Sequence, residues 1–216
     1  MSTRIIIADD HAIVRHGLSR AFDQQEDINV IGQAKNGLAT IELVRKLSPD
    51  VVVMDIAMPD LNGIEATRQI VAASPNVKVI GLSMHSSNRY VREMFKAGAS
   101  GYLLKDCAFE ELLEAIRNVA QGKTYVSPSV GDIVVQDFLH GTGDETSAFS
   151  TLTTRERQVL QLLAEGNTTK QVAQRLYISP KTVEAHRLRV MNKLNIDNIA
   201  QLTKYAIQEG LTLPEP

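Results

Sequence analysis

The sequence predicts an α/β domain followed by a smaller all-α domain. Between Arg4 and about Gly122, short apolar runs alternate five times with amphipathic segments. Further along the chain, apolar residues recur at helical spacing only, in four segments. The intervening stretch, 126–150, contains acidic residues but no basic ones, and small polar residues gather toward its end, as is typical of a linker. We therefore expect domains at 1–125 and 151–216.

Each of the five repeats in the first domain combines one strand with one helix. The runs expected as strands are 4–8, 29–34, 51–54, 77–82 and 101–104. The helical stretches lie near 12–23, 37–47, 63–73, 87–97 and 109–120. Because the strands are almost continuously apolar, we expect a parallel sheet with helices on both faces. Right-handed crossovers leave few topologies, of which a five-stranded, flavodoxin-like order is the simplest.

The three parts of the chain differ in net charge. Residues 1–126 carry −1, residues 127–150 carry −4 and residues 151–216 carry +3. The mildly basic C-terminal part suits a polyanionic partner. Within the linker, one short helix could form from the apolar residues Val130, Ile133, Val134, Phe138 and Leu139.

The second domain is predicted to contain four helices. The first begins with a capping box, in which Thr153 and Glu156 satisfy each other's backbone N–H groups, and ends at Gly166. The pair Ser179-Pro180 supplies a capping hydroxyl and a first-turn proline for the third. The other helices are expected at 168–176 and 199–207, and the third runs to about 194. The short turn Tyr177-Ile178 between the second and third helices is a helix-turn-helix signature.

Composition excludes several classes of protein. The 216 residues contain no apolar run near the ~20 residues that span a bilayer. The N-terminus enters an apolar strand directly, so no signal peptide is evident. Cys107 is the single cysteine, which excludes an internal disulfide and fits a reducing compartment. We therefore expect a cytoplasmic protein that does not act at a membrane.

Four of the expected strands end on polar residues of one chemical set. Asp9 and Asp10 follow the first strand, Asp55 the third, Ser83 the fourth and Lys105 the fifth. The carboxyl ends of parallel strands meet at one edge of the sheet. Hard carboxylate oxygens there indicate Mg²⁺, and a carboxylate that attacks phosphorus forms an aspartyl-phosphate. Asp55, at the centre of this edge, is the expected nucleophile, and Lys105 offsets charge on the transferred group.

Taken singly, each of these residues has an ordinary explanation. A lone aspartate after a strand is most often a turn residue or a helix cap, and a lone lysine is a solvated charge. It is their joint appearance at four strand ends of one sheet that indicates a phosphoryl-handling site.

The segments around these residues extend the pattern. Four segments together resemble the receiver domain of bacterial response regulators. They are Asp9-Asp10, the stretch 54–59 together with Gly63, the residue Ser83, and the stretch 98–105. The resemblance covers residues 4 to about 122. It implies that a sensor histidine kinase transfers phosphate to the aspartate at 55.

The resemblance also implies roles for individual residues. Asp10, Asp55 and the Ala57 backbone carbonyl would hold Mg²⁺, with Asp9 acting through water. Ser83 and Tyr102 would form the switch pair, in which the hydroxyl moves to the phosphoryl group and the aromatic ring turns inward. From spacing alone, the tyrosine is equally well explained as a half-buried strand aromatic.

Three positions depart from the receiver pattern. Asp106 stands where many receivers have a proline after the lysine. Ala57 offers no polar side chain two residues past the acceptor, and His85 stands two past Ser83. The family tunes dephosphorylation at the last two positions, so the lifetime of the aspartyl-phosphate is left open. His85 is equally well explained as a surface histidine.

The C-terminal domain has a second resemblance. Several segments are similar to the LuxR-type helix-turn-helix. They are the stretches 152–160, 170–173 and 178–186, the residue Gly166 and the pair Lys193-Leu194. The resemblance spans about 151–210. A receiver followed by this module resembles the NarL/FixJ class of two-component transcriptional regulators.

The third helix of this domain is the expected DNA-reading element. Its candidate contacts are polar or short side chains away from the buried stripe, and two further candidates lie at the start of the second helix. The full set is Thr169, Lys170, Lys181, Thr182, Ala185, His186, Arg189 and Lys193. Glu184 either accepts from a cytosine amino group or pairs with Arg187 or Lys181 at the surface, and the surface pair is favoured.

We therefore expect a DNA-binding response regulator whose phosphorylation favours a dimer on DNA. RNA polymerase is a further candidate partner. The protein is expected to be a phosphoacceptor rather than a turnover enzyme.

Two alternatives use the same residues. One is an aspartate-nucleophile phosphohydrolase, which Ala57 disfavours because it cannot serve as a general acid or base. The other is a phosphate-independent dimeriser that binds DNA constitutively, which gives no reason for the acidic set.

Overall fold

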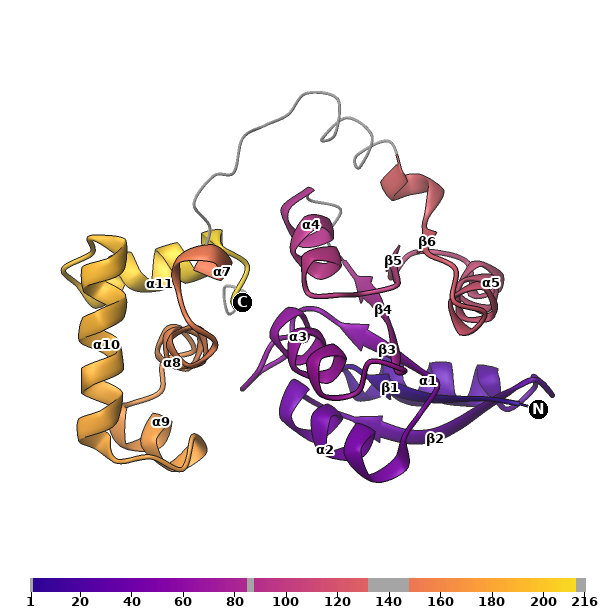
Figure 1. Ribbon diagram of the computed structural model, residues 1–216, viewed down its shortest axis with the longest axis horizontal. Coiled ribbons are helices and arrows are strands. Elements are labelled where there is room, and N and C mark those ends of the chain that lie inside the picture. The colour runs from indigo at the N-terminus through magenta and orange to yellow at the C-terminus, as the bar shows by residue number, and fades with distance from the viewer. Residues whose placement is uncertain (1, 85–87, 132–147, 213–216) are drawn as a thin grey trace. The chain divides into compact units, whose positions relative to one another are not determined.

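The computed structural model describes residues 2–84, 88–131 and 148–212. The chain divides into two compact units with the boundary near residue 142, and each is considered by itself. The first unit is an α/β domain and the second is all-α (Figure 1). Among the described helices, none combines the length and apolarity that a bilayer crossing requires.

The first unit is built on one parallel sheet in the order β2-β1-β3-β4-β5-β6. Its strands are β1 (Thr3–Ala8), β2 (Ile28–Ala34), β3 (Val51–Asp55), β4 (Lys78–Ser83), β5 (Gly101–Leu104) and β6 (Tyr125–Val126). The predicted α/β class and flavodoxin-like order of the first five strands are confirmed. The predicted count of five was one short, because β6 is only two residues long and carries too little pattern to be recognised.

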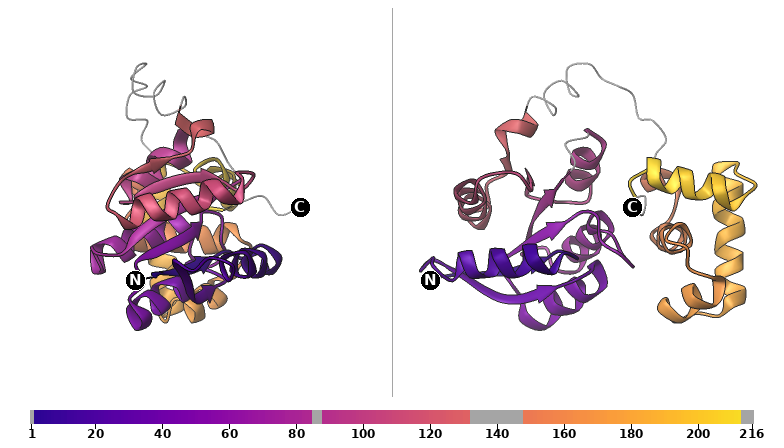
Figure 2. Two further views of the ribbon diagram at one scale, coloured as in Figure 1. Left: turned by 90° about the vertical axis from the view of Figure 1, so that its right-hand side faces the viewer. Right: turned by 180° about the vertical axis from the view of Figure 1, so that it is seen from behind.

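Helices cover both faces of this sheet, as the sequence predicted (Figure 2). They are α1 (Ala12–Phe22), α2 (Gly37–Leu47), α3 (Gly63–Ala73), α4 (Asn88–Lys96) and α5 (Phe109–Ala120). Side chains of α1 and α5 pack against one face, which presents alternate residues of the central strands such as Ile5, Val53 and Ile80. The opposite face is lined by α2, α3 and α4 and is closely packed, since a Cβ added at Gly81 would lie 3.1 Å from Cγ of Met94 in α4. Burial on both faces is why these strands lack polar alternation.

The second unit contains α7 (Ala148–Thr151), α8 (Thr154–Ala164), α9 (Thr169–Arg175), α10 (Pro180–Leu194) and α11 (Ile199–Gln208). The last four are the four predicted helices. Gly166 ends the first of them with φ +77°, and Tyr177 adopts φ +54° in the turn before α10. The short helix α7 was not predicted. Of the helix expected in the linker, residues 128–131 are helical. The rest of that expected helix, including Ile133, falls within 132–147, outside the described residues.

The N-terminal cap of α8 gives a direct test of local stability. The Thr153 hydroxyl accepts from the N–H of Glu156 at 3.3 Å, and the Glu156 carboxylate accepts from the N–H of Thr153 at 2.9 Å. We expect Thr153→Ala to lower the free energy of unfolding of this unit by about 1 kcal/mol. Chemical denaturation followed by circular dichroism measures it. Thr203→Ala, inside α11, is the matched control, and an equal loss there would contradict the cap assignment.

Candidate functional site

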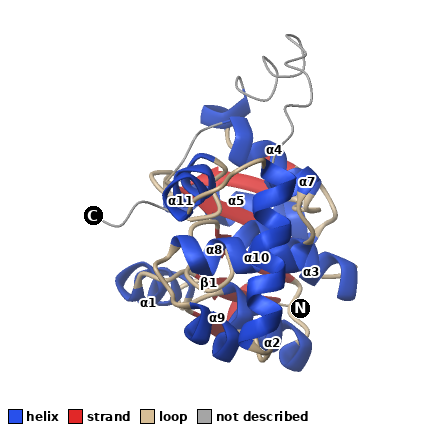
Figure 3. Ribbon diagram, turned by 90° about the vertical axis from the view of Figure 1, so that its left-hand side faces the viewer, coloured by secondary structure: helices blue, strands red, loops and turns tan. Residues whose placement is uncertain are grey.

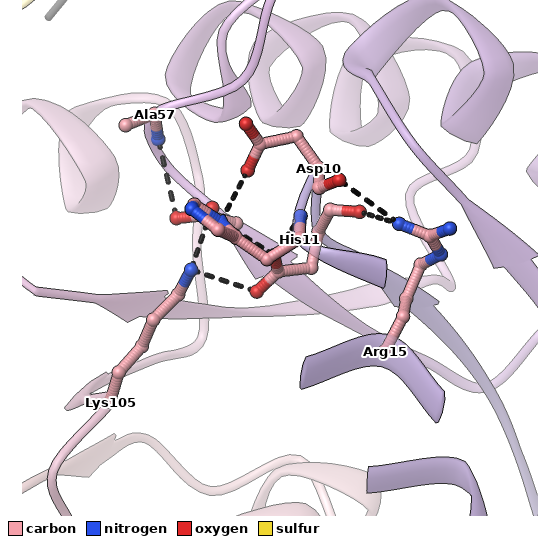
Figure 4. A network of polar contacts seen from close by, with 7 residues as sticks. Asp10, His11, Arg15, Ala57 and Lys105 are labelled. Atoms are coloured by element: carbon pink, nitrogen blue, oxygen red, sulfur yellow. Dashed lines mark hydrogen bonds and ion pairs between the residues drawn. The ribbon is translucent and has the colours of Figure 1, made fainter. Parts of the chain in front are cut away.

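Three strands place carboxylates and one ammonium at a single edge of the sheet. Asp9 follows β1, Asp55 is the last residue of β3 and Lys105 follows β5. Figure 4 shows the Lys105 side chain extending into this edge, near Asp10 and His11. Asp9 and Asp55 are buried, at 1% and 3% exposed, whereas Asp10 is exposed. Ligand atoms of Asp9, Asp10, His11 and Asp55 all lie within 4.8 Å of one another. The parallel register brings these groups together because β1 and β3 are neighbours.

Lys105 is shared by the two buried carboxylates. Its Nζ atom lies 2.8 Å from Oδ2 of Asp55 and 2.8 Å from Oδ2 of Asp9. Both distances suit charge-assisted hydrogen bonds from the ammonium. One ammonium facing two buried carboxylates leaves the edge with excess negative charge. A divalent cation with its retained waters fits such a set.

Electrostatics at this edge follow from burial. Burial raises the pKa of Asp55 to about 6, even though the neighbouring Lys105 ammonium acts to lower it. For Lys105 the balance is reversed: burial acts to lower its pKa, but the carboxylates of Asp55 and Asp9 outweigh this and raise it. The Asp55 carboxylate is therefore costly to ionise in the metal-free protein, and a bound cation relieves that cost.

Two residues that sequence reasoning missed, His11 in the loop after β1 and Arg15 in α1, also contact this site. The backbone N–H of His11 donates to Oδ1 of Asp9 at 2.8 Å, and its Nδ1 lies 2.8 Å from Oδ1 of Asp10. Arg15 donates to the backbone carbonyls of Asp9 at 2.6 Å and of Asp10 at 3.3 Å. The N–H two residues after an aspartate is a common local donor, which is the signal that could have pointed to His11.

Ser83 and Tyr102 also meet at this side of the sheet. Ser83 ends β4 and is buried, and Tyr102 on the adjacent β5 is 0% exposed. Burial raises the pKa of the Tyr102 hydroxyl to about 12, although a hydrogen bond with Ser83 acts to lower it. Gly81 gives the ring its space, because a Cβ there would come within 3.3 Å of the ring. The aromatic side chain therefore occupies the inward position of the expected switch pair.

Ala57 and His85 are the remaining candidates in the receiver domain. The backbone N–H of Ala57 donates to Oδ1 of Asp55 at 3.3 Å, so the loop after β3 helps to orient the carboxylate. His85 lies outside the described residues.

The candidate DNA contacts of the second unit fall into two groups. Lys170, Lys181, Thr182 and Arg189 are exposed on α9 and α10, and Ala185 is half-buried. Two of the other three, Lys193 and Thr169, contact acidic side chains of their own unit. Lys193 lies 2.8 Å from Oε2 of Glu156, the capping-box residue. Thr169 donates to Glu184 at 2.6 Å.

His186, the remaining candidate, is half-buried. Its Nδ1 is buried and, within the described residues, has no hydrogen-bond partner. Burial lowers its pKa, and the neighbouring cations Arg189 and Arg155 lower it further. The imidazole is therefore held in its neutral form.

Glu184 links α10 to α9. Oε1 accepts from the Thr169 hydroxyl at 2.6 Å, and Oε2 lies 3.6 Å from the guanidinium of Arg187. The favoured surface pair with Arg187 is therefore present. The link to Thr169 spans fifteen residues and was not foreseen, because sequence spacing does not show which helix faces another.

Comparison with known proteins agrees with this arrangement. Residues 5–117 match the response regulator receiver domain, and residues 150–206 match the bacterial regulatory proteins of the luxR family. The chain is a two-component response regulator with a LuxR-type DNA-binding domain. The predicted family, fold and general function are thus confirmed. Proteins of this kind work with sensor kinases and with DNA.

Relatives match along almost the whole length. The oxygen regulatory protein NreC of Staphylococcus carnosus is 37% identical over 213 residues, covering 96% of this chain and 98% of NreC. The transcriptional regulatory protein DegU of Brevibacillus brevis is 36% identical over 221 residues, covering 96% and 94%. RcsB of Salmonella enterica, solved on the rprA promoter with the phosphomimetic BeF₃⁻, has a TM-score of 0.61 at 29% identity, covering 95% of this chain and 98% of RcsB.

Proposed function

We propose that Asp55 accepts a phosphoryl group from a sensor histidine kinase and that this event controls transcription through dimerisation on DNA. The main support is the shared lysine: Lys105 lies 2.8 Å from both Asp55 and Asp9, at an edge rich in carboxylates. Asp55 is buried, and its hydrogen-bond partners include the Lys105 ammonium and the backbone N–H of Ala57. Such a carboxylate is a nucleophile positioned for an incoming electrophile.

The chemistry at Asp55 is a displacement at phosphorus. A carboxylate oxygen of Asp55 forms a bond to phosphorus while the bond from phosphorus to the donor breaks, and the donor keeps that electron pair and gains a proton. Lys105 then pairs with a phosphoryl oxygen, and Ser83, at the end of the adjacent strand, donates to another. The buried Tyr102 is hydrogen-bonded to Ser83 and moves with it.

The carboxylate cluster fits Mg²⁺, which would be held by Asp10, Asp55 and the Ala57 carbonyl, with Asp9 acting through water. When bound, the ion offsets negative charge on the transferred group. The protein acts as a phosphoacceptor that at most hydrolyses its own adduct slowly, since Ala57 supplies no general base. It works in the cytoplasm, and RNA polymerase is a further partner at the promoter.

Intact mass tests this proposal. The full chain is incubated with Mg²⁺ and acetyl phosphate, beside Asp55→Asn, and the oligomeric state is measured by sedimentation with and without beryllofluoride. We expect one added phosphoryl group on the wild type and none on the variant, and a shift to dimer with the mimic. A dimer that forms equally without phosphodonor or mimic would favour the phosphate-independent alternative. Steady release of phosphate would favour the phosphohydrolase.

A further inference from the structure

The outward face of α10 has an apolar centre. Leu188 is 59% exposed near the middle of the helix, whereas Val183 and Val190 on the same helix are buried at 0% and 1%. Helical spacing places Leu188 on the face opposite these valines, together with Lys181 and Ala185. Figure 3 looks onto this helix, which lies along the outside of its unit. The isobutyl group therefore contributes little to the core of the domain.

A single exposed leucine is common on protein surfaces and by itself indicates nothing. Here its surroundings indicate the partner. Lys181, two turns before Leu188, is an exposed cation on the same face of α10, and the exposed Arg189, directly after Leu188, lies at the side of that face. Glu184, one turn before Leu188, also lies on this face, but its carboxylate is held by Thr169 and Arg187. A helix with cations around an apolar centre complements duplex DNA, whose phosphates flank a groove that admits an α-helix.

Within that groove, the apolar group on a base edge is the C5-methyl of thymine. We propose that Leu188, supported by Ala185 one turn earlier, contacts a thymine C5-methyl group and specifies thymine at one position of each half-site. This inference rests on the DNA-binding part of the proposed function and is independent of phosphoryl transfer at Asp55. Leu188 was not among the predicted contacts, because these were restricted to polar and short side chains.

Removal of the methyl group tests the contact directly. A duplex is selected from a randomised library by the full chain, and each thymine is then replaced singly by deoxyuridine, which keeps base pairing. We expect one thymine per half-site at which the wild type loses about fourfold in affinity, the value for one buried methyl group. Leu188→Ala should bind the thymine and deoxyuridine duplexes with nearly equal affinity. Leu188→Met, which keeps an apolar contact, should retain most of the preference.

Ile199→Ala removes another exposed apolar side chain of the same unit, at the start of α11, and should leave the preference unchanged. Circular dichroism confirms that each variant folds. Wild-type indifference to deoxyuridine at every thymine would overturn the inference, as would an unchanged preference in Leu188→Ala. Either result would direct Leu188 to a protein partner instead. If the wild type bound no duplex at all, it is DNA binding under the proposed function that would fail.

Discussion

Gly63→Ala is expected to destabilise the receiver domain by at least about 3 kcal/mol. A Cβ atom at this first residue of α3 would lie 2.0 Å from the carbonyl oxygen of Asp55 and 3.0 Å from Cα of Ile56. Both are backbone atoms, so no change of rotamer can relieve the clash. The N–H of Gly63 also donates to the carbonyl of Ile56 at 2.8 Å, which ties α3 to the loop after β3. Urea denaturation followed by far-ultraviolet circular dichroism measures the loss.

Gly17→Ala is the matched control within the same domain. Gly17 lies inside α1, and no described atom is within 4 Å of the position its Cβ would take. Alanine there removes the helix penalty of glycine, so we expect a gain of about 0.5–1 kcal/mol. The two substitutions add the same methyl group and should change stability in opposite directions. A small effect at Gly63 would mean that the loop carrying Asp55 can move aside.

Much of the phosphoacceptor edge could be predicted from the sequence because its geometry is set by the sheet. Strands that are buried on both faces read as apolar runs, and the first polar residue after each run marks the strand end. Asp9, Asp55 and Lys105 were located in this way, and the structure places them within ion-pair distance. Helix caps such as Thr153 could also be predicted, because the N–H group to which the capping side chain binds lies only three residues further along the chain.

The features that were missed depend on contacts between distant segments. β6 pairs with β5 through only two residues, so no periodicity signals it. The hydrogen bond from Thr169 to Glu184 depends on how α9 meets α10, which spacing along one helix does not reveal. The ion pair of Lys193 with Glu156 is likewise set by the packing of α10 on α8. Pairings between helices therefore depend on packing that the sequence pattern of one helix does not show.

Asp55→Asn is expected to stabilise the metal-free protein at about pH 7 by up to about 3 kcal/mol. Burial raises the pKa of Asp55 from its ordinary value of 3.8 to about 6 in the folded state. At pH 7 the folded protein therefore ionises this carboxyl at a free-energy cost that the unfolded chain does not bear. Asparagine has nearly the same shape and carries no charge, so the variant avoids this cost. Urea denaturation of both proteins in the presence of a chelator measures the difference.

The sign of the pH dependence follows from the same shift. Between pH 3.8 and about 6 the folded state holds a proton on Asp55 that the unfolded state has released. Stability of the wild type relative to Asp55→Asn should therefore fall as pH rises through this window and level off above it. At about pH 4 the two proteins should be nearly equal in stability. Taking the difference between them cancels the titration of other carboxylates.

Magnesium should make the wild type more stable than Asp55→Asn, the reverse of the order expected without metal. A cation held by Asp10 and Asp55 neutralises the charge that burial makes costly, and any ligand of the folded state adds stability as its concentration exceeds the dissociation constant. We therefore expect Mg²⁺ to stabilise the wild type strongly and Asp55→Asn weakly. If Mg²⁺ stabilised both proteins equally, the ion would not use Asp55. If the variant were no more stable than the wild type without metal, Lys105 would already compensate the cost of burying the Asp55 charge.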